Sequence, residues 1–289
     1  MITVDIILIC YNQEQYIEQA LRSIYEQHLA KAVSVRIIVA DDASLDDTLA
    51  IIKRLAPESP FPITFLPKEH NMGISKNYKR SFAATEADYV AILEGDDYWL
   101  PNHLAQHIRF FKWHPRYTLS INNLQFFEEG KGLIDAHWPY IIPYVSISLL
   151  QQIKDGNQLG NLSSCVFRGK FLRELPDSFF ELDFADWELG MYLAQYGPMA
   201  KLREVSSIYR VKSSGQWVKL NDDERAASRI ATIDAMDEFF GRKYHDSFLV
   251  VRNRVEKKER FSYTNVPMVS VCLVNIKNWL KSIKHFLGG

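Results

Sequence analysis

The chain has 289 residues, 47% of them hydrophobic, and a formal net charge of −1. This size and composition fit one large domain with an extension, or two small domains, that bury a substantial core. The near-neutral charge provides no overall positive field of the kind that nucleic-acid-binding proteins use to neutralise phosphates, so no nucleic-acid partner is expected.

Residues 1–115 alternate short β-branched runs with helical patterns, which is typical of a largely parallel sheet with helices on both faces. The chain runs from Met1 directly into an apolar segment that is too short and too acidic for a signal peptide. We interpret this segment as the first core strand. Strands are expected at residues 3–9, 33–40, 62–66 and 88–93.

Crossover helices are expected between these strands. Apolar residues recur at helical spacing after the first strand, and Asn12 with Gln15 is expected to cap the helix that they form. A second helix is expected to begin at Ser44 and Asp47, a pair that resembles a capping box.

Residues 116–215 are less regular, and their aromatic-rich strands and loops indicate α+β packing against the first half. Strands are expected at 118–127 and 202–211, and a helix at 187–196. From residue 218 the pattern is helical, beginning with 222–240.

Acidic and polar residues follow three of the predicted strands, in the segments Cys10-Tyr11-Asn12, Asp41-Asp42-Ala43-Ser44 and Glu94-Gly95-Asp96-Asp97. Ligands of open parallel sheets bind beyond the carboxyl ends of the strands. Carboxylates that converge there repel one another, and Mg²⁺ or Mn²⁺ bridging to substrate phosphates would relieve that repulsion. The sequence therefore predicts a metal–diphosphate site.

With Asn71-Met72-Gly73-Ile74-Ser75-Lys76-Asn77, these segments stand in the order and spacing of a known family. The chain resembles family 2 of the inverting glycosyltransferases, which have the GT-A fold. The resemblance implies an α/β, Rossmann-like fold with a mostly parallel central sheet flanked by helices and a C-terminal helical extension. It implies a glycosyltransferase domain at 1–217, with a nucleotide-sugar half at 1–115 and an acceptor half at 116–217, followed by the extension at 218–289.

The resemblance assigns residues to the donor. They are Tyr11, Asn12, Asp41, Asp42, Gly73, Lys76, Asn77, Asp96 and Lys212. Asp42 would accept a hydrogen bond from an N–H of the nucleotide base; the alternative is that it is a turn or helix-capping residue. Asp41 would contact the ribose; the alternative is that it is a capping residue. Gly73 would let the backbone approach the donor, and Lys76, where relatives often have Arg, would neutralise the diphosphate.

The acidic segment is expected to bind Mn²⁺ or Mg²⁺. By resemblance, Asp97 is the direct metal ligand and Asp96 lies nearer the ribose. The alternative without a metal is that the segment is simply an acidic loop ahead of a helix that begins near Pro101. Glu94 stands where the family often has Asp, so its contact is open. Lys212 replaces a common His and would stabilise the leaving diphosphate, or is an exposed loop lysine.

Asp186 is the candidate general base, because the segment Phe184-Ala185-Asp186-Trp187-Glu188-Leu189 resembles the family's acidic helix start. A general base must be ionised and within hydrogen-bond reach of the acceptor hydroxyl. Alternatively Asp186 is only an N-cap, and Glu188 or Asp183 takes the role.

The resemblance implies transfer of a sugar from a nucleotide-diphosphate sugar, with a UDP-sugar as first candidate, to the hydroxyl of a saccharide or lipid-linked saccharide. Bacterial surface polysaccharide or lipopolysaccharide synthesis is the family's commonest use. Two rivals remain: a nucleotidyltransferase, which would need a glycine-rich basic loop after the first strand, and a catalytically degenerate nucleotide-sugar-binding module that serves as an assembly partner.

Location and partners are indicated by weaker features. Cys10, Cys165 and Cys272 are far apart and odd in number, which favours a reducing cytoplasm. The segment 267–287 mixes apolar residues and Trp with Lys. It is expected to contact the inner face of the cell membrane peripherally, or to pack on the core or on a second subunit of a homo-oligomer.

A pair of histidines, His103 and His107, has the spacing of zinc ligands, but Leu104 replaces the glutamate of the metalloprotease motif, so both are expected at the surface. The chain has neither a GxGxxG after the first strand nor a GKS/T loop, which argues against a dinucleotide oxidoreductase and a P-loop NTPase.

Overall fold

The computed structural model describes residues 1–67, 70–128, 130–134, 142–182, 186–211 and 220–257. In chain order the elements are β1 (Ile2–Cys10), α1 (Ile17–Tyr25), β2 (Val33–Asp41), α2 (Thr48–Leu55), β3 (Ile63–Phe65), α3 (Ile74–Ala83), β4 (Tyr89–Glu94), β5 (Tyr98–Trp99), α4 (His103–Trp113) and β6 (Leu119–Glu128). They continue with β7 (Gly132–Ile134), β8 (Tyr144–Ile147), α5 (Leu149–Lys154), β9 (Cys165–Arg168), α6 (Gly169–Arg173), α7 (Asp186–Leu193), β10 (Met199–Val211), α9 (Asp222–Phe239) and α10 (His245–Glu256).

One ten-stranded sheet runs through both predicted halves, in the order β3-β2-β1-β4-β9-β6-β10-β5, with β7 on β6 and β8 on β10. The strands β3, β2, β1 and β4 are parallel, and β2, β1 and β4 carry the buried β-branched runs that predict this arrangement. Beyond β4 the sheet is mixed, since β9 pairs antiparallel with β4 and β6 whereas β10 runs parallel to β6. The α/β class with a helix-flanked central sheet is confirmed.

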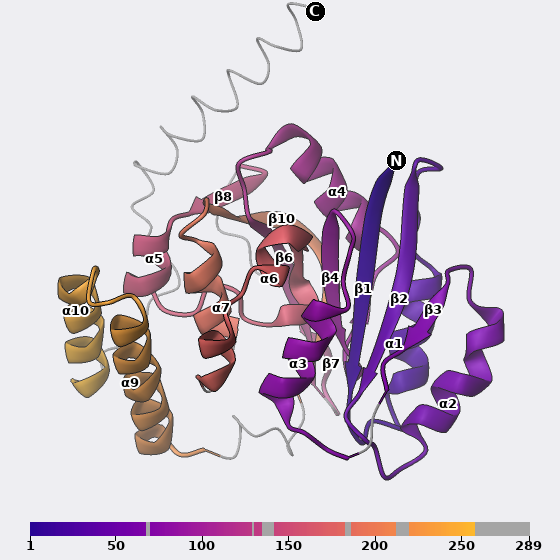
Figure 1. Ribbon diagram of the computed structural model, residues 1–289, viewed down its shortest axis with the longest axis horizontal. Helices are drawn as coiled ribbons and strands as arrows, with labels where there is room; N and C mark the ends of the chain where they lie inside the picture. Colours follow the sequence, from indigo (N-terminus) through magenta and orange to yellow (C-terminus); the bar gives the residue numbers. More distant parts are fainter. Residues whose placement is uncertain (68–69, 129, 135–141, 183–185, 212–219, 258–289) are drawn as a thin grey trace, which may run out of the picture.

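Helices cover both faces of the sheet and enclose two apolar cores (Figure 1). On one face α1, α2 and α4 bury residues such as Leu21, Ile52 and Phe111. On the other face α3, α7, α9 and α10 bury residues that include Phe82 and Met236. In Figure 1, α9 and α10 lie on the far side of the molecule from β2 and β3, so they pack against the second half.

The strands predicted near residues 3–9, 33–40, 62–66 and 88–93 are confirmed, but both predicted helix caps are wrong. The N-cap of α1 is Tyr16 and that of α2 is Asp47, and neither donates or accepts a side-chain capping bond. Asn12 and Ser44 instead bind each other's loops, because Asn12 Oδ1 accepts from the backbone N–H of Leu45 at 2.8 Å and Asn12 N–H donates to Ser44 Oγ at 3.0 Å.

The prediction that His103 and His107 lie at the surface is also wrong. Both are fully buried on α4 between Trp99 and β6. The rings of His103 and Trp99 stack with their centroids 4.3 Å apart, and His107 Nδ1 lies 2.6 Å from Ser120 Oγ.

The predicted C-terminal extension is described as far as residue 257. Its helices α9 and α10 bury Ile233, Met236, Phe248 and Val251 in the second core. The segment 267–287 lies outside the described residues, so its predicted contact with a membrane, the core or a partner stays a prediction, as do the domain boundaries. Among the described residues, no helix is long and apolar enough to span a membrane.

Candidate active site

The carboxyl ends of β1, β2 and β4 meet at one edge of the sheet. Cys10 pairs in register with Asp41, and Ile9 pairs with Glu94. The connections past these strands continue the ladder, because Asp42 N–H donates to Cys10 C=O and Gly95 N–H donates to Ile9 C=O, both at 2.9 Å. The segments singled out in the sequence therefore lie side by side.

The loops after β1 and β2 are locked together in strained conformations. Asn12 and Ala43 have φ values of 52° and 61°, which are uncommon for residues with a side chain. The carboxylate of Asp41 accepts the Ser44 backbone N–H at 3.1 Å and also the Ser44 hydroxyl. Asp41 thus caps this loop, and its contact with a ribose stays a prediction. Strain of this kind persists where the surroundings enforce it and is concentrated at functional sites.

Asp42 joins the β2 edge to the segment before α3. It is 5% exposed, and its two oxygens accept the backbone N–H groups of Met72 at 3.0 Å and Gly73 at 2.9 Å. Gly73 has a φ of 83° and forms the N-cap of α3. Each carboxylate oxygen has a further lone pair, so these bonds orient Asp42 while leaving it able to accept from a base.

Asn77 and Arg80 fasten α3 beneath this edge. Asn77 Nδ2 donates to Ala40 C=O at 2.9 Å, and Asn77 Oδ1 accepts from Arg80 Nε at 2.8 Å. Arg80 also donates to Asp41 C=O at 2.8 Å. Lys76, the cation chosen from the sequence, is exposed on the same helix. Arg80 was missed, although it lies four residues after Lys76 and therefore on the same helix face.

The acidic loop that follows β4 turns tightly against α1. Asp97 N–H donates to Glu94 C=O at 2.9 Å and closes the turn. A Cβ atom on Gly95 would lie 2.4 Å from Gln13 Oε1 and 2.7 Å from Ile17 Cδ1. Only glycine fits there without displacement, so the glycine of this motif holds the loop close to the start of α1.

Two distant residues hold the carboxylates of this loop. Asn161 Nδ2 donates to Asp97 Oδ2 at 2.8 Å and to Glu94 Oε2 at 3.0 Å. Arg210 backbone N–H donates to Asp97 Oδ1 at 3.0 Å. Asp97 is 1% exposed, whereas Asp96 is half-buried. Sequence reasoning did not predict these contacts of Asn161 and Arg210 with the carboxylates.

The buried carboxyls of Glu94 and Asp97 lie close together in the acidic loop. Burial and the charge of Asp96 raise the pKa of Asp97 to about 7. Burial, Asp97 and Asp96 raise the pKa of Glu94 well above its usual range. Among the described residues, no Lys or Arg forms a salt bridge with Glu94 or Asp97. The loop thus presents oxygen ligands whose repulsion a divalent cation would relieve.

Those ligands fit a cation shared with substrate. Among the described residues, no set of three or more His, Cys, Asp and Glu side chains is arranged to enclose a metal ion. Mg²⁺ and similar ions are commonly held by one or two carboxylates together with substrate phosphates. The loop therefore suits a metal site that the phosphates of a donor complete.

Asp186, the candidate base, is the first residue of α7. Its carboxylate accepts from Asn157 Nδ2 at 2.7 Å and from Trp187 N–H at 3.0 Å. Burial raises the pKa of Asp186. Its charge also helps to raise the pKa of Glu94 and that of Tyr78, so it lies within electrostatic reach of the acidic loop.

The substitutes for Asp186 are placed differently. Glu188 is 2% exposed, and its Oε1 accepts from Thr232 Oγ1 on α9 at 2.8 Å. Asp183 lies outside the described residues, and so does Lys212. Of the candidates that the structure describes, Asp186 is the one whose charge acts on the acidic loop.

The family model for glycosyl transferase family 2 matches residues 5–175, which include the three strand-end segments and Asn161. The chain belongs to glycosyltransferase family 2. An uncharacterized protein of Mycobacterium bovis is 29% identical over 239 residues, which are 80% of this chain and 67% of that protein. The dTDP-rhamnosyl transferase RfbG of Shigella flexneri is 31% identical over 130 residues, 43% of this chain and 44% of its own length.

Solved glycosyltransferases share the fold. TarS of S. aureus, in a complex with UDP-GlcNAc, superposes with a TM-score of 0.60 at 17% identity, over 82% of this chain and 67% of TarS. A mannosyltransferase of Pyrobaculum calidifontis, in a complex with GDP-Man and Mn²⁺, gives a TM-score of 0.56 at 15% identity, over 95% and 75% of the two chains. At these identities the likeness concerns the fold, which agrees with the family 2 glycosyltransferase assignment.

Proposed function

We propose that this glycosyltransferase transfers a sugar from a nucleotide-diphosphate sugar, with a UDP-sugar as first candidate, to an acceptor hydroxyl with inversion. The observation that carries the proposal is the acidic loop, in which Glu94 and Asp97 are held by neutral donors and have no described cationic partner. We assign the acceptor to the saccharides and lipid-linked saccharides of bacterial surface polysaccharide. The rhamnosyl transferase relative and the nucleotide-sugar complexes of the structural neighbours support a nucleotide-sugar donor.

The donor is proposed to lie across the ends of β1 and β2. Asp42 faces this edge with spare acceptor capacity, as contact with a base N–H requires. Tyr11 is exposed beside it and Gly73 brings the backbone close. Asp41, Asn12 and Asn77 shape the loops around the donor, because their side chains are bonded to the protein itself.

Asp96 and Asp97 are proposed to hold Mn²⁺ or Mg²⁺, which as a Lewis acid would neutralise the diphosphate charge. Asp97 has both oxygens engaged in protein hydrogen bonds, whereas Asp96 is the more accessible of the two. Replacing each in turn therefore identifies the direct ligand.

Asp186 is proposed to accept the proton of the acceptor hydroxyl as its oxygen attacks the anomeric carbon. Its bond from Asn157 fixes the carboxylate, and the burial that raises its pKa strengthens it as a base. The bond from oxygen to the anomeric carbon forms as the bond to the diphosphate breaks on the opposite face. One displacement with inversion needs no covalent sugar–enzyme intermediate.

The test is calorimetric titration with UDP, GDP and dTDP, with and without Mn²⁺, on the wild-type chain, Asp96→Asn and Asp97→Asn. We expect one nucleotide to bind in a Mn²⁺-dependent manner, and the variant of the direct ligand to lose that dependence. Lys53→Glu, an exposed substitution on α2, serves as the control. Failure of all three nucleotides to bind would contradict the donor site.

The second candidate is a nucleotide-sugar-binding module without turnover. It is favoured by Ala185, where the family usually has an acidic residue. Metal-dependent nucleotide binding combined with no transfer and no donor hydrolysis on a panel of saccharide and lipid-linked acceptors would support it. Formation of a product with inverted anomeric configuration, observed by NMR, would exclude it.

A further inference from the structure

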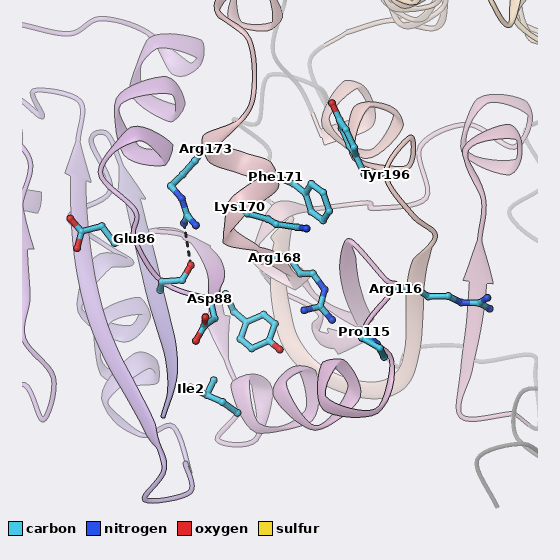
Figure 2. A pocket seen from close by; sticks show the side chains of 12 residues that line it. Ile2, Glu86, Asp88, Pro115, Arg116, Arg168, Lys170, Phe171, Arg173 and Tyr196 are labelled. Carbon is cyan, nitrogen blue, oxygen red and sulfur yellow. Dashed lines mark hydrogen bonds between the residues drawn. The ribbon is translucent and has the colours of Figure 1, made fainter. Parts of the chain in front are cut away.

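A cleft of about 660 Å³ lies at the other end of the parallel strands, where β1 and β4 begin (Figure 2). It is lined by Ile2 at the start of β1, by Tyr89 at the start of β4, and by residues of β9 and α6. The six residues of β4, from Tyr89 in the cleft to Glu94, separate the cleft from the acidic loop, roughly 17 Å at the rise of an extended strand. Its volume falls in the range of small-molecule sites.

The cleft gathers Arg168, Lys170 and Arg173. Arg168 is half-buried, and the groups to which its guanidinium donates in the described part of the chain are backbone carbonyls, that of Tyr117 at 2.8 Å and those of Phe111 and His114 at 3.4 and 3.3 Å. It also lies over the ring of Phe111, 5.0 Å from its centroid. These contacts orient the cation without cancelling its charge.

The other two cations reach the same space. Arg173 donates to Ala87 C=O at 3.1 Å, a bond drawn in Figure 2. Lys170 Nζ lies 4.5 Å from the ring of Phe171, which stacks on Tyr196 at 5.2 Å. Within the described ranges, none of the three cations forms a salt bridge with a carboxylate.

Among the described residues, the two acidic residues of the lining form no salt bridge with these three cations. Asp88 accepts from Thr3 N–H at 2.9 Å and from Thr3 Oγ1 at 3.0 Å. The Glu86 side chain is 85% exposed, and its carboxylate lies 4.0 Å from Arg36. Figure 2 shows Glu86 directed away from the three cations. The cleft is therefore a positively charged hollow with aromatic walls.

We propose that this cleft binds a phosphate-bearing ligand at a site separate from the nucleotide-sugar donor. A guanidinium fork and an ammonium are the groups that proteins use for phosphate, the first by paired hydrogen bonds and the second as a compact charge. Phosphate oxygens would accept hydrogen bonds from the N–H groups of Lys170 and Arg173. The stacked rings of Phe171 and Tyr196 would contact the apolar part of the ligand.

The test is calorimetric titration with inorganic pyrophosphate in EDTA, which removes the metal that the donor site needs. Lys170→Glu and Arg173→Gln are expected to weaken binding at least tenfold, whereas Lys53→Glu and Asp96→Asn leave it unchanged. Thermal unfolding confirms that each variant is folded. Binding that Asp42→Ala abolishes and Lys170→Glu leaves intact would place the probe in the donor site and overturn the proposal, as would the absence of binding by wild type.

Vesicles distinguish the source of the phosphate. Co-sedimentation with phosphatidylglycerol vesicles but not with phosphatidylcholine vesicles, lost in Lys170→Glu, would assign a lipid headgroup. Pyrophosphate binding without co-sedimentation would assign a free phosphate compound. Both results support the site, and independence from Lys170 in both arms overturns it. None of these readouts depends on glycosyl transfer, so the proposed enzyme activity can fail without affecting this result.

Discussion

Buried carboxyl groups at the two ends of the parallel strands differ in their partners and in the direction of their pKa shifts. We call the end that holds Asp5 the structural end and the end that holds Glu94 and Asp97 the functional end. Asp5, on β1, is 3% exposed and pairs in register with Arg36 on β2. Arg36 binds both of its oxygens, at 2.8 and 2.9 Å, and the N–H groups of Glu86 and Ala87 add two more bonds. Burial alone would raise the pKa of Asp5, but these donors outweigh it and hold the pKa below its usual range.

Among the described residues, the carboxyl groups of Glu94 and Asp97, at the other end, accept hydrogen bonds from the amide of Asn161, the backbone N–H of Arg210 and the hydroxyl of Tyr78, and from no cationic side chain. Burial therefore prevails, and the pKa values of both carboxyls are raised. Within the part of the chain that the structure describes, a cation pairs with the carboxylate of Asp5 in the fold, whereas no salt bridge is formed by Glu94 or Asp97 at the candidate active site. Perturbed groups of this second kind are concentrated at functional sites, where an external cation or a proton completes them.

The largest effect is expected from Asp186→Asn, which removes a carboxylate of the functional end. The amide retains the shape and can still bond to Asn157, but it cannot accept a proton. Transfer should fall about 10²- to 10⁴-fold, the usual contribution of a general base, while nucleotide binding by calorimetry stays unchanged. The measurement is kcat with saturating donor.

Glu188→Gln is the matched control for Asp186→Asn, because Glu188 lies two residues away and bonds to Thr232. It should leave kcat within a few-fold of wild type. A smaller loss in Asp186→Asn than in Glu188→Gln would transfer the role of base to Glu188.

Asp5→Asn tests the structural end. It leaves Arg36 without its carboxylate partner, and removal of one member of a charged hydrogen-bonded pair costs about 2–3 kcal/mol of unfolding free energy. Urea denaturation measures the change, and nucleotide affinity should be unaltered. Glu86→Gln, in which an exposed carboxylate 4.0 Å from Arg36 is neutralised, should change stability by less than about 0.5 kcal/mol. Equal effects of the two variants would contradict the distinction.

Asn161→Ala weakens the functional end without removing a carboxylate. It deletes the donor shared by Glu94 and Asp97. Hydrogen bonds to charged groups contribute about 1.5–3 kcal/mol, so kcat/KM should fall about 10- to 100-fold. A higher Mn²⁺ concentration should recover part of the lost activity, because the bound cation would reduce the repulsion between Glu94 and Asp97 that the Asn161 amide otherwise limits. Ser164→Ala, which changes a neighbouring buried hydroxyl that bonds only within its own segment, is the control.

Recovery by Mn²⁺ distinguishes a positioning role from a purely structural one. If Asn161→Ala loses activity and no concentration of Mn²⁺ restores any of it while the variant remains folded, Asn161 does not act through the metal site.

The sequence predicted the strands and the strand-end acids because both are local patterns. Buried β-branched runs fix the strands, and parallel strands bring their carboxyl ends to one edge without any knowledge of side chains. The family motifs then pointed to the strand-end segments 41–42 and 94–97. The structure brings these two segments to the same edge of the sheet, on either side of the end of β1.

What the sequence could not predict depends on contacts between distant segments. Asn161 and Arg210 lie 64 and 113 residues from Asp97 along the chain. The predicted caps failed for the same reason, since Asn12 and Ser44 bind across the two loops and not to their own helices. The prediction that His103 and His107 are exposed was wrong because it rested on their being polar residues. In the structure α4 buries both of them between a tryptophan and the sheet.

The buried histidines His103 and His107 are a third kind of titratable site, which the fold keeps neutral and does not pair with a carboxylate, and they carry the last prediction. Burial lowers the pKa of His103 and lowers that of His107 to about 3. In the unfolded chain His103 and His107 bind a proton as the pH falls through about 6.5. In the folded chain they stay neutral at that pH, so a falling pH favours the unfolded state. Their contribution to stability is fully present above about pH 6.5. It declines by up to about 1.4 kcal/mol per pH unit for each histidine as pH falls towards the folded pKa.

Urea denaturation between pH 5 and 8 measures this slope, and His107→Asn isolates one histidine from the carboxylates that titrate in the same range. Asn retains a polar group near Ser120 Oγ, which lies 2.6 Å from His107 Nδ1. The variant should be less stable than wild type at pH 8 but lose less stability per pH unit below 6.5. His28→Asn, at an exposed position, should leave the slope unchanged. An equal slope in wild type and His107→Asn would mean that His107 gains a proton without unfolding the core, which its enclosure between α4 and β6 opposes.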